Sequence, residues 1–525
     1  MSSGFAVDAA VLLGGVLLLV GVIASGLTSR LRIPGLLLFL GLGMVVADDG
    51  LALVRFDDAG LAQNIAIAAL VVILFEGGIG TDPGAFRTLG VASGLLASVG
   101  VVVTAGVVAL VVWLVTGMEV ITALLLGSVV ASTDAAAVFA ALRSESFPPR
   151  IRQLLQLESG LNDPVAVLLT VGVLETWRSS PTAGDWVLFL GVQMLAGVGV
   201  GLGVGRIGRW VVDRVSGTAA VSLGVVTLAV AGISYGAAAV VGGSGFLAVY
   251  LTGVVLTGSN RASRSVLYFH EGLAATAQGV LFLLLGILVF PSQLTDHLGV
   301  AVVVAATLVL LARPLAVALV LLPWRMPLRE VTVVSWAGLR GAVPVVLATI
   351  PFTAGHPDGA VVFDVAFVVV ILSVAVQAPT VGALARRLGV VEPARVVVRR
   401  EIVPIDAHDA DLVELHVPSA ARLSDTTLKS SPLPAGARVV VIHRDDETLV
   451  AHGDTTIEAG DVLLVVIPRS SDLDEVERWS HSLLDSDDHA EEANDAANDA
   501  DDEPDGRVHH LRPPGHVDPD SGSDE

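Results

Sequence analysis

Residues 157–171, LESGLNDPVAVLLTV, place four polar side chains in a run that is otherwise apolar. Ser159 and Asp163 are four residues apart, as are Glu158 and Asn162, so on a helix each pair shares a face and the two faces adjoin. A carboxylate at membrane depth is costly unless it is paired, hydrated or bound to a cation. The stretch therefore predicts a functional polar patch inside a membrane-spanning helix.

A second polar pair, Thr133 and Asp134, lies in the preceding apolar run, VVASTDAAAV at 129–138. In the first stretch Pro164 has no backbone N–H, so the carbonyl of Gly160 loses its helical partner. Irregular backbone at membrane depth is tolerated only where it lines a cavity or is buried in protein. Freed carbonyls and carboxylates suit a hard monovalent cation, and the pattern predicts an ion-translocation site.

Apolar stretches of about 20 residues, which is the length needed to cross a bilayer, recur from Ala9 to Leu388. We predict about thirteen spans and hence an α-helical polytopic membrane protein embedded in a lipid bilayer. The predicted spans are 9–26, 33–48, 60–78, 91–115, 119–142, 153–175, 185–205, 219–235, 238–258, 271–290, 297–322, 331–353 and 361–384.

The arginines between these spans fall almost entirely on one side of the membrane. If the N-terminus is outside, Arg55 and Arg178 lie outside, and the positive-inside rule makes the other, arginine-rich side cytoplasmic. An odd number of spans then puts the C-terminus in the cytoplasm, which fits a multi-pass protein of the plasma membrane. The inside set is Arg30, Arg32, Arg87, Arg143, Arg150, Arg152, Arg206, Arg209, Arg214, Arg261, Arg264, Arg325, Arg329, Arg386 and Arg387.

Two further charged residues lie within predicted spans: Glu76 in VVILFEGGIG and Arg340 in SWAGLRGAVP. An arginine at this depth needs a carboxylate partner, for which Glu158 and Asp134 are the candidates. We favour a structural ion pair between Glu158 and Arg340 over a transport role for these two. Asp134 could instead cap a helix break, and Glu76 could be interfacial and hydrated. Asp163 has no neutralising charge nearby in sequence, which makes it the strongest candidate for transport.

The composition changes near Val390 and divides the chain into four predicted parts. Residues 1–390 form the transmembrane domain, 391–400 a short basic linker and 401–478 a small soluble domain. Residues 479–525 are rich in Asp, Glu, Asn, Pro and Gly, and we expect a disordered acidic tail there. The chain has no cysteine, which excludes disulfides and thiolate metal sites.

Short β-branched runs predict strands in the soluble domain. They are DLVELHV at 411–417, ARVVVIHR at 437–444 and DVLLVVIP at 461–468. Turn residues separate them, in PLPAG at 432–436 and IEAGD at 457–461.

Four motifs together resemble the NhaP and CvrA branch of the monovalent cation:proton antiporter-1 family. They are TDAAAVFAAL at 133–142, LESGLNDPVAVLL at 157–169, HEGLAATAQGVLFLLLGILV at 270–289 and WAGLRGAVPVVLA at 336–348. The resemblance covers nearly all of residues 9–390. It implies a fold of inverted repeats with interrupted helices, in which a core domain moves against a dimerisation domain, so we expect a homodimer.

The resemblance also implies roles for individual residues. Asp163, beside Asn162, would bind a proton and a cation alternately, and Glu158 would be held by Arg340. The pairing of an asparagine with an aspartate resembles the electroneutral members. The monovalent cation would lie at Asp163, Ser159 and Thr133, and the implied ion-binding set is Glu76, Thr133, Asp134, Ser159, Asn162 and Asp163.

The soluble domain resembles the C-terminal half of regulatory modules for potassium conductance, the TrkA-C or RCK-C type. The stretch that carries this resemblance is LSDTTLKSSPLPAGARVVVIHRDDETLVAHGDTTIEAGDVLLVV at 423–466. Potassium/proton antiporters of the CvrA type often bear such a module, which favours K⁺ as the cation by analogy. We expect a cytosolic nucleotide ligand here, such as a cyclic dinucleotide, with passive dimerisation as the alternative role.

These observations predict a secondary antiporter that exchanges cytoplasmic K⁺, or Na⁺, for external H⁺ by alternating access. It would need no cofactor, perform no enzymatic reaction and bind no nucleic acid. One alternative is a ligand-gated potassium channel, but the chain lacks a TVGYG filter. Another is a sensor with a membrane anchor, which would not require so many polar groups inside its spans.

Overall fold

The structure is a computed structural model. The chain divides into two compact units, residues 1–393 and residues 394–525. The described residues are 12, 14–23, 35–53, 58–81, 83–134, 138, 147–179, 181–214, 220–257, 264–391, 403–405, 410–417, 427–430, 433, 436–444 and 447–468. Most of the predicted linker and all of the predicted acidic tail therefore lie outside the described residues.

The first unit is a bundle of apolar helices, and each of the predicted spans overlaps at least one of them. In the described part of the chain, eight helices are long and apolar enough to cross a membrane, and five more apolar helices are shorter. In chain order the helices are Gly14–Ile23, α2 (Gly35–Val46), α3 (Ala59–Ile79), α4 (Pro83–Leu95), α5 (Val101–Thr116), α6 (Val120–Val129), α8 (Pro149–Ser179), α9 (Ala183–Arg214), α10 (Ala220–Val240), α11 (Gly245–Thr257), α12 (Arg264–Leu288), α13 (Pro291–Thr307), α14 (Arg313–Leu321), α15 (Leu328–Trp336), α16 (Val343–Thr353) and α17 (Gly359–Arg387).

The same order of elements occurs twice in this unit. In the first copy the π-helical turn η2 (Leu96–Gly100) joins α4 to α5, an interruption follows α6, and the long helix α8 comes next. In the second copy η3 (Leu308–Ala312) joins α13 to α14, an interruption separates α15 from α16, and the long helix α17 follows. The copies begin at the fourth and eleventh apolar helices, an odd number of crossings apart, so they run through the membrane in opposite directions. This is the predicted inverted repeat.

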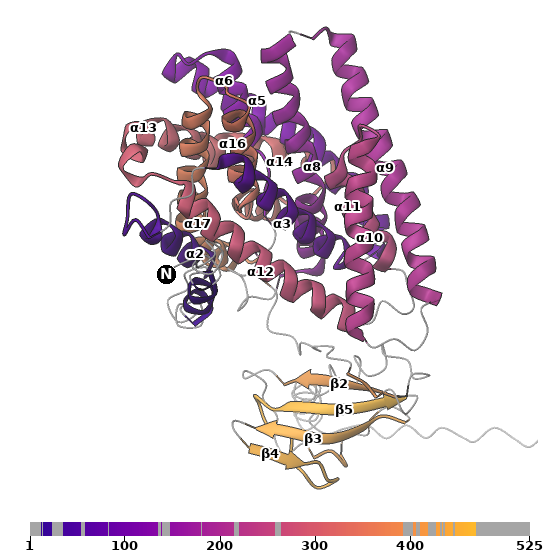
Figure 1. The fold of residues 1–525 in the computed structure, drawn as a ribbon. Helices are drawn as coiled ribbons and strands as arrows, with labels where there is room; N and C mark the ends of the chain where they lie inside the picture. Colours follow the sequence, from indigo (N-terminus) through magenta and orange to yellow (C-terminus); the bar gives the residue numbers. More distant parts are fainter. Residues whose placement is uncertain are drawn as a thin grey trace, which may run out of the picture. The chain divides into compact units, whose positions relative to one another are not determined.

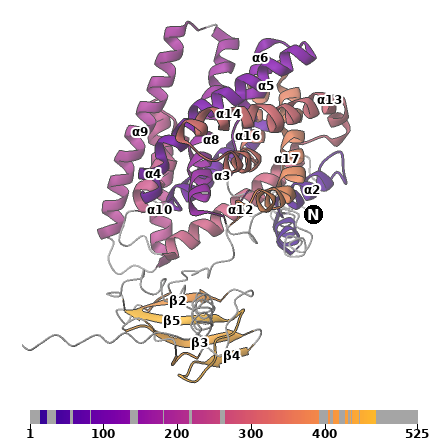
Figure 2. The same ribbon diagram turned by 180° about the vertical axis from the view of Figure 1, so that it is seen from behind.

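The helices pack in two groups. Helices α9 to α11 pack on one another, α11 packs on α3, and α12 packs on α2, α3 and α10, whereas α4, α5, α6 and α8 pack with helices among α13 to α17. Both ribbon views place α9 and α13 on opposite sides of the unit, with α3 and α8 between them (Figure 1, Figure 2). Glycine allows one close approach in the first group, since a Cβ at Gly253 on α11 would lie 2.9 Å from the Cα of Gly78 on α3.

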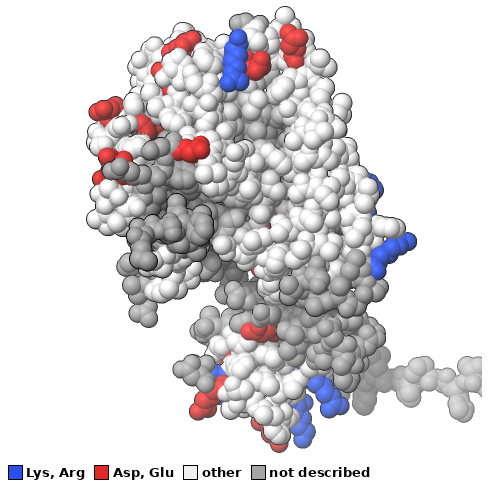
Figure 3. All heavy atoms as spheres, in the orientation of Figure 1, with Lys and Arg blue, Asp and Glu red and all other residues white. Residues whose placement is uncertain are grey.

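The surface of the membrane unit matches a bilayer environment. The visible face over α9 to α12 carries few charged side chains along its height, and basic side chains appear toward its lower end (Figure 3). Large apolar side chains are exposed on α9 and α10, for example Leu195, which is 77% exposed, and Val240, which is 87% exposed. Such exposure is expected where lipid covers the surface.

The second unit is a small antiparallel sheet with strand order β1-β2-β5-β3-β4. The three predicted strands are confirmed as β2 (Ala410–His416), β3 (Arg438–Arg444) and β5 (Val462–Pro468). Two short strands, β1 (Val403–Ile405) and β4 (Glu447–Val450), were not predicted. Both predicted turns contain a glycine with positive φ, Gly436 at 88° and Gly460 at 96°. The core of the unit includes Leu415, Val417, Ala437, Ile442, Ile457, Leu463, Val465 and Ile467.

Candidate functional site

Two interrupted helices meet at the centre of the second helix group. Helix α6 ends at Val129, and the chain from Ser132 to Asp134 is not helical. The second interruption lies between Trp336, where α15 ends, and Val343, where α16 begins. The backbone N–H of Asp134 donates to the carbonyl of Leu339 at 2.8 Å, which joins the two interruptions directly. The structure thus places Thr133 and Asp134 at a crossing of interrupted helices.

Arg340 donates hydrogen bonds to backbone carbonyls that have no helical partner because α6 is interrupted. Its guanidinium Nη1 donates to the carbonyl of Ala131 at 2.7 Å and also to that of Ser132, and the residue is 1% exposed. Its backbone N–H donates to the hydroxyl of Ser373 on α17 at 3.1 Å. A cation at the C-terminal end of a helix is stabilised by the helix dipole, so Arg340 both neutralises and holds this end of α6.

The polar face of α8 binds the same interruption. The hydroxyl of Ser159 donates to the carbonyl of Thr133 at 3.0 Å, and the amide Nδ2 of Asn162 donates to the hydroxyl of Thr133 at 2.6 Å. Asn162 is fully buried and Asp163 is 6% exposed. Three of the predicted ion ligands, Ser159, Thr133 and Asp163, therefore come from one small region.

Several buried polar atoms of this region have no hydrogen-bond partner in the described part of the chain. They include Oδ1 of Asp163, Oδ1 of Asn162, and Nε and Nη2 of Arg340. Asp134 and Arg340 are the charged groups that act electrostatically on Asp163. A buried polar atom without a partner costs about 1–3 kcal/mol, and more when it is charged. Unpaired acceptor oxygens of this kind can be satisfied by a dehydrated monovalent cation or, at the carboxylate, by a proton.

Glycine permits the close crossing at Asp134. A Cβ at Gly341 would overlap the carboxylate of Asp134, so a larger residue at position 341 would separate the two interruptions.

Glu76 is half-buried one turn before the end of α3. The charged groups that act on it are Glu271 and Asp134, which places it within electrostatic range of the crossing.

The predicted ion pair between Glu158 and Arg340 is wrong, because the direct partner of Glu158 is Arg313. Two hydrogen bonds join their side chains, from Nη1 to Oε1 and from Nη2 to Oε2, the second at 2.8 Å. Glu158 is 1% exposed and Arg313 is 4% exposed. Arg340 instead donates to the carbonyls of Ala131 and Ser132, and backbone partners of this kind leave no signal in the sequence.

Arg313 was not singled out from the sequence, although it carries a clear signal. It is a lone arginine in the apolar run 301–322, the same pattern that drew attention to Arg340. It also follows directly on the π-helical turn η3, and such turns are frequent at functional sites.

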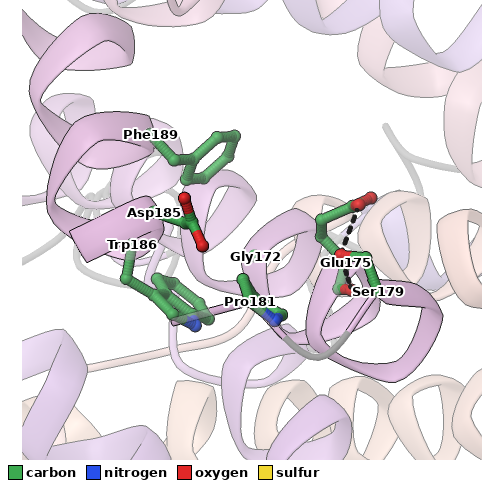
Figure 4. A pocket seen from close by; sticks show the side chains of 7 residues that line it. All are labelled: Gly172, Glu175, Ser179, Pro181, Asp185, Trp186 and Phe189. Atoms are coloured by element: carbon green, nitrogen blue, oxygen red, sulfur yellow. Dashed lines mark hydrogen bonds between the residues drawn. The ribbon is translucent and has the colours of Figure 1, made fainter. Parts of the chain in front are cut away.

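A separate cavity of about 320 Å³ lies where α8 ends and α9 begins, lined by Gly172, Glu175, Ser179, Pro181, Asp185, Trp186 and Phe189 (Figure 4). Both of its carboxylates are bonded locally. Glu175 accepts from the hydroxyl of Ser179 at 2.9 Å, and Asp185 accepts from the backbone N–H of Thr182 at 2.9 Å. Gly172 follows Asp163 by nine residues, about 13 Å along the helix, so this cavity is distinct from the ion site.

Comparison with known proteins places this geometry in a family. The model of the sodium/hydrogen exchanger transmembrane domain matches residues 15–387. The chain belongs to the sodium/hydrogen exchanger family. It is therefore a membrane transporter rather than an enzyme. The TrkA-C domain model matches residues 412–481, so the predicted resemblances of both units are confirmed.

Curated relatives cover most of the chain. The K(+)/H(+) antiporter NhaP of Alkalimonas amylolytica is 37% identical over 88% of this chain and 81% of its own length. The K(+)/H(+) antiporter NhaP2 of Shewanella baltica is 34% identical over 87% of this chain and 80% of its own length. The sodium proton antiporter MjNhaP1 of Methanocaldococcus jannaschii has the same fold, with a TM-score of 0.64, 22% identity, and coverage of 73% of this chain and 99% of that one.

The ion pair of Glu158 and Arg313 predicts strong coupling between these residues. Glu158→Ala and Arg313→Ala should each lower the free energy of unfolding by about 3–5 kcal/mol, because each strands a buried charge. The double variant should be less destabilised than the sum of the two. Thermal unfolding of the purified protein in detergent measures all three. As a comparison, a cycle of Glu158→Ala with Arg340→Ala should show weaker coupling, and equal coupling in both cycles would contradict the assignment.

Proposed function

We propose that the protein exchanges cytoplasmic K⁺ or Na⁺ for external H⁺ at one shared carboxylate, Asp163. The observation that carries this proposal is that Oδ1 of the buried Asp163 carboxylate has no hydrogen-bond partner among the described residues, as is also true of the amide oxygen of Asn162. Protonation of Asp163 removes its charge and its affinity for a cation, whereas a bound cation displaces the proton. Ser159 and Thr133 supply neutral oxygen ligands, and Asp134 and Glu76 supply negative charge along the ion path.

K⁺ is the favoured cation of this proposal. The relatives from Alkalimonas amylolytica and Shewanella baltica, which each match more than four-fifths of this chain, are both named K(+)/H(+) antiporters. Na⁺ is the alternative, since the Na(+)/H(+) antiporter NhaS2 of Synechocystis is 32% identical over 55% of this chain and 53% of its own length. A ligand-gated channel is disfavoured, because a pore does not need a buried carboxylate beside an interrupted helix.

We place the protein in the plasma membrane with the N-terminus outside and the C-terminus in the cytoplasm. The support is the arginine distribution, for example Arg206, Arg209 and Arg214 near the end of α9 and Arg386 and Arg387 at the end of α17.

The second unit is proposed to regulate exchange. The limits proposed are 401–478 for the regulatory domain, 391–400 for its linker and 479–525 for the acidic tail, with the exchanger in 1–390. A linker of about ten residues can transmit force between the domain and α17. The domain would bind a cytosolic nucleotide as a symmetric pair within a homodimer, and would act by preferring one transport state.

Replacement of the proposed carboxylate should abolish exchange. Asp163→Asn should remove proton flux driven by K⁺ or by Na⁺, while the protein still inserts, because the change removes a buried charge and keeps the shape. The measurement uses the protein in liposomes with an internal pH dye and each cation in turn. Asp364→Asn is the matched control: Asp364 is also in a membrane helix, but it is bonded to His297 at 3.0 Å. Near-normal exchange by Asp163→Asn would disprove the assignment.

Exchange should be electroneutral, with one cation moved for each proton. The reason is that Asp163 is accompanied by the neutral Asn162 rather than by a second carboxylate. In the same liposomes, an imposed membrane potential should leave the exchange rate unchanged at a fixed pH gradient. A clear acceleration or slowing by the potential would contradict one-to-one exchange.

Removal of residues 401–525 should leave exchange intact but change its dependence on pH or on cytosolic nucleotides. Removal of 482–525 alone is the control, and it should leave regulation unchanged because the TrkA-C match ends at residue 481. If the larger deletion matches the full chain in rate, pH profile and nucleotide response, the domain is not regulatory.

A further inference from the structure

Tyr250, on α11, contacts both the end of α3 and the part of α8 that carries the proposed ion ligands. It is one of three tyrosines in the chain and is fully buried in α11. Its hydroxyl lies 3.2 Å from the hydroxyl oxygen of Thr81, just beyond the end of α3. The hydroxyl of Thr81 donates its proton to the carbonyl of Gly77 at 2.7 Å, so Tyr250 is the donor to Thr81. This bond holds the tyrosine ring at the end of α3, the same end that carries Glu76.

The ring of Tyr250 also lies against Gly160 on α8. A Cβ at Gly160 would overlap Cε2 of the ring and would lie 2.5 Å from Cζ and 2.8 Å from the hydroxyl oxygen. Gly160 directly follows Ser159 and precedes Asp163 by three residues, and residues three apart are neighbours on a helix surface. The ring therefore packs beside the part of α8 that carries the proposed ion ligands.

This contact joins the two helix groups. Tyr250 belongs to α11, which packs with α3, α9 and α10, whereas α8 packs with α4, α6 and α16. A second bond lies one turn earlier on α8, where the side chain of Gln156 donates to the carbonyl of Gly80 at 2.9 Å. Gln156 and Gly160 are four residues apart, so α8 presents one strip of its surface to the end of α3 and to Tyr250.

We propose that Tyr250 is a positioning residue for the exchange reaction. By packing on Gly160, its ring fixes the place of Asp163 relative to α3 and α11 and excludes water from that flank of the site. Because glycine has no side chain, α8 can slide past the ring when the ion site switches from facing one side of the membrane to facing the other. A side chain at position 160 would interlock with the ring. This proposal rests on the proposed exchange at Asp163, and it assigns Tyr250 no contact with the ion.

The experiment compares Gly160→Ala, Tyr250→Leu and the double variant in the full-length protein reconstituted in liposomes. Each single variant should raise the apparent KM for K⁺ by about tenfold, because a small misplacement of a binding group has effects of this order or larger. Each should also shift the pH of half-maximal exchange. The double variant should lie closer to wild type than the product of the singles, since the shorter side chain makes room for the added methyl group.

Two further variants separate positioning from a loss of stability. Tyr250→Phe keeps the ring but removes its hydrogen bond to Thr81, so it should shift KM and the pH profile less than Tyr250→Leu does. Tyr235 on α10 lies against Gly245 on α11, away from α8. A Cβ at Gly245 would be 2.6 Å from the ring of Tyr235. Tyr235→Leu should at most lower the yield of folded protein and leave KM and pH profile unchanged.

The proposal for Tyr250 is overturned if Tyr250→Leu and Gly160→Ala keep the KM and pH profile of wild type, or if their effects simply multiply. In either case wild-type exchange and its loss in Asp163→Asn would leave the proposed function standing. Absence of cation-dependent exchange in the wild-type protein would instead overturn the proposed function, and the role of Tyr250 with it.

Discussion

The interruption of α6 leaves backbone carbonyls inside the membrane unit that no helical N–H can reach, and the arrangement of the site follows from how they are paired. Arg340 takes the carbonyls of Ala131 and Ser132, and Ser159 takes the next one, that of Thr133. Since unpaired carbonyls are costly where water is absent, these bonds fix the interruption in place. The hydrogen bonds that the interrupted backbone requires thus set the geometry around Asp163 before any ion binds.

The two repeats solve the same structural problem with different chemistry. In α17 the hydroxyl of Ser373 accepts from the interrupted backbone of the second repeat, and Gln377, four residues later, donates to the carbonyl of Trp336 at 3.0 Å. In α8, Ser159 donates its hydroxyl proton to the carbonyl of Thr133 in the interruption of the first repeat. Each interruption is therefore held by polar side chains of the long helix that follows it in its own repeat.

The sequence located the buried polar groups of the helix bundle well and their partners less well. Apolar length located the helices, and polar residues within them located the crossing. The sequence could not predict which way Arg340 points. A charged residue within an apolar run shows that the side chain needs a partner, but not on which side of the helix that partner lies. The partner of Glu158 was wrong for that reason, and because Arg313 was overlooked. In the second unit, β1 and β4 have three and four residues, which is too short to show an alternating pattern.

In the proposed mechanism the obligatory coupling of the two ions follows from burial. An ionised Asp163 that holds neither a proton nor a cation would carry an unpaired charge through the membrane interior, where a lone charge is strongly disfavoured. The protonated form and the cation-bound form are both free of that penalty, so these are the forms that cross. Asp134 and Arg340 act on Asp163 with opposite signs, and the neighbouring Asn162 adds no net charge. Exchange without leakage then requires no additional gate for the empty site, because its own electrostatic energy keeps it from changing sides.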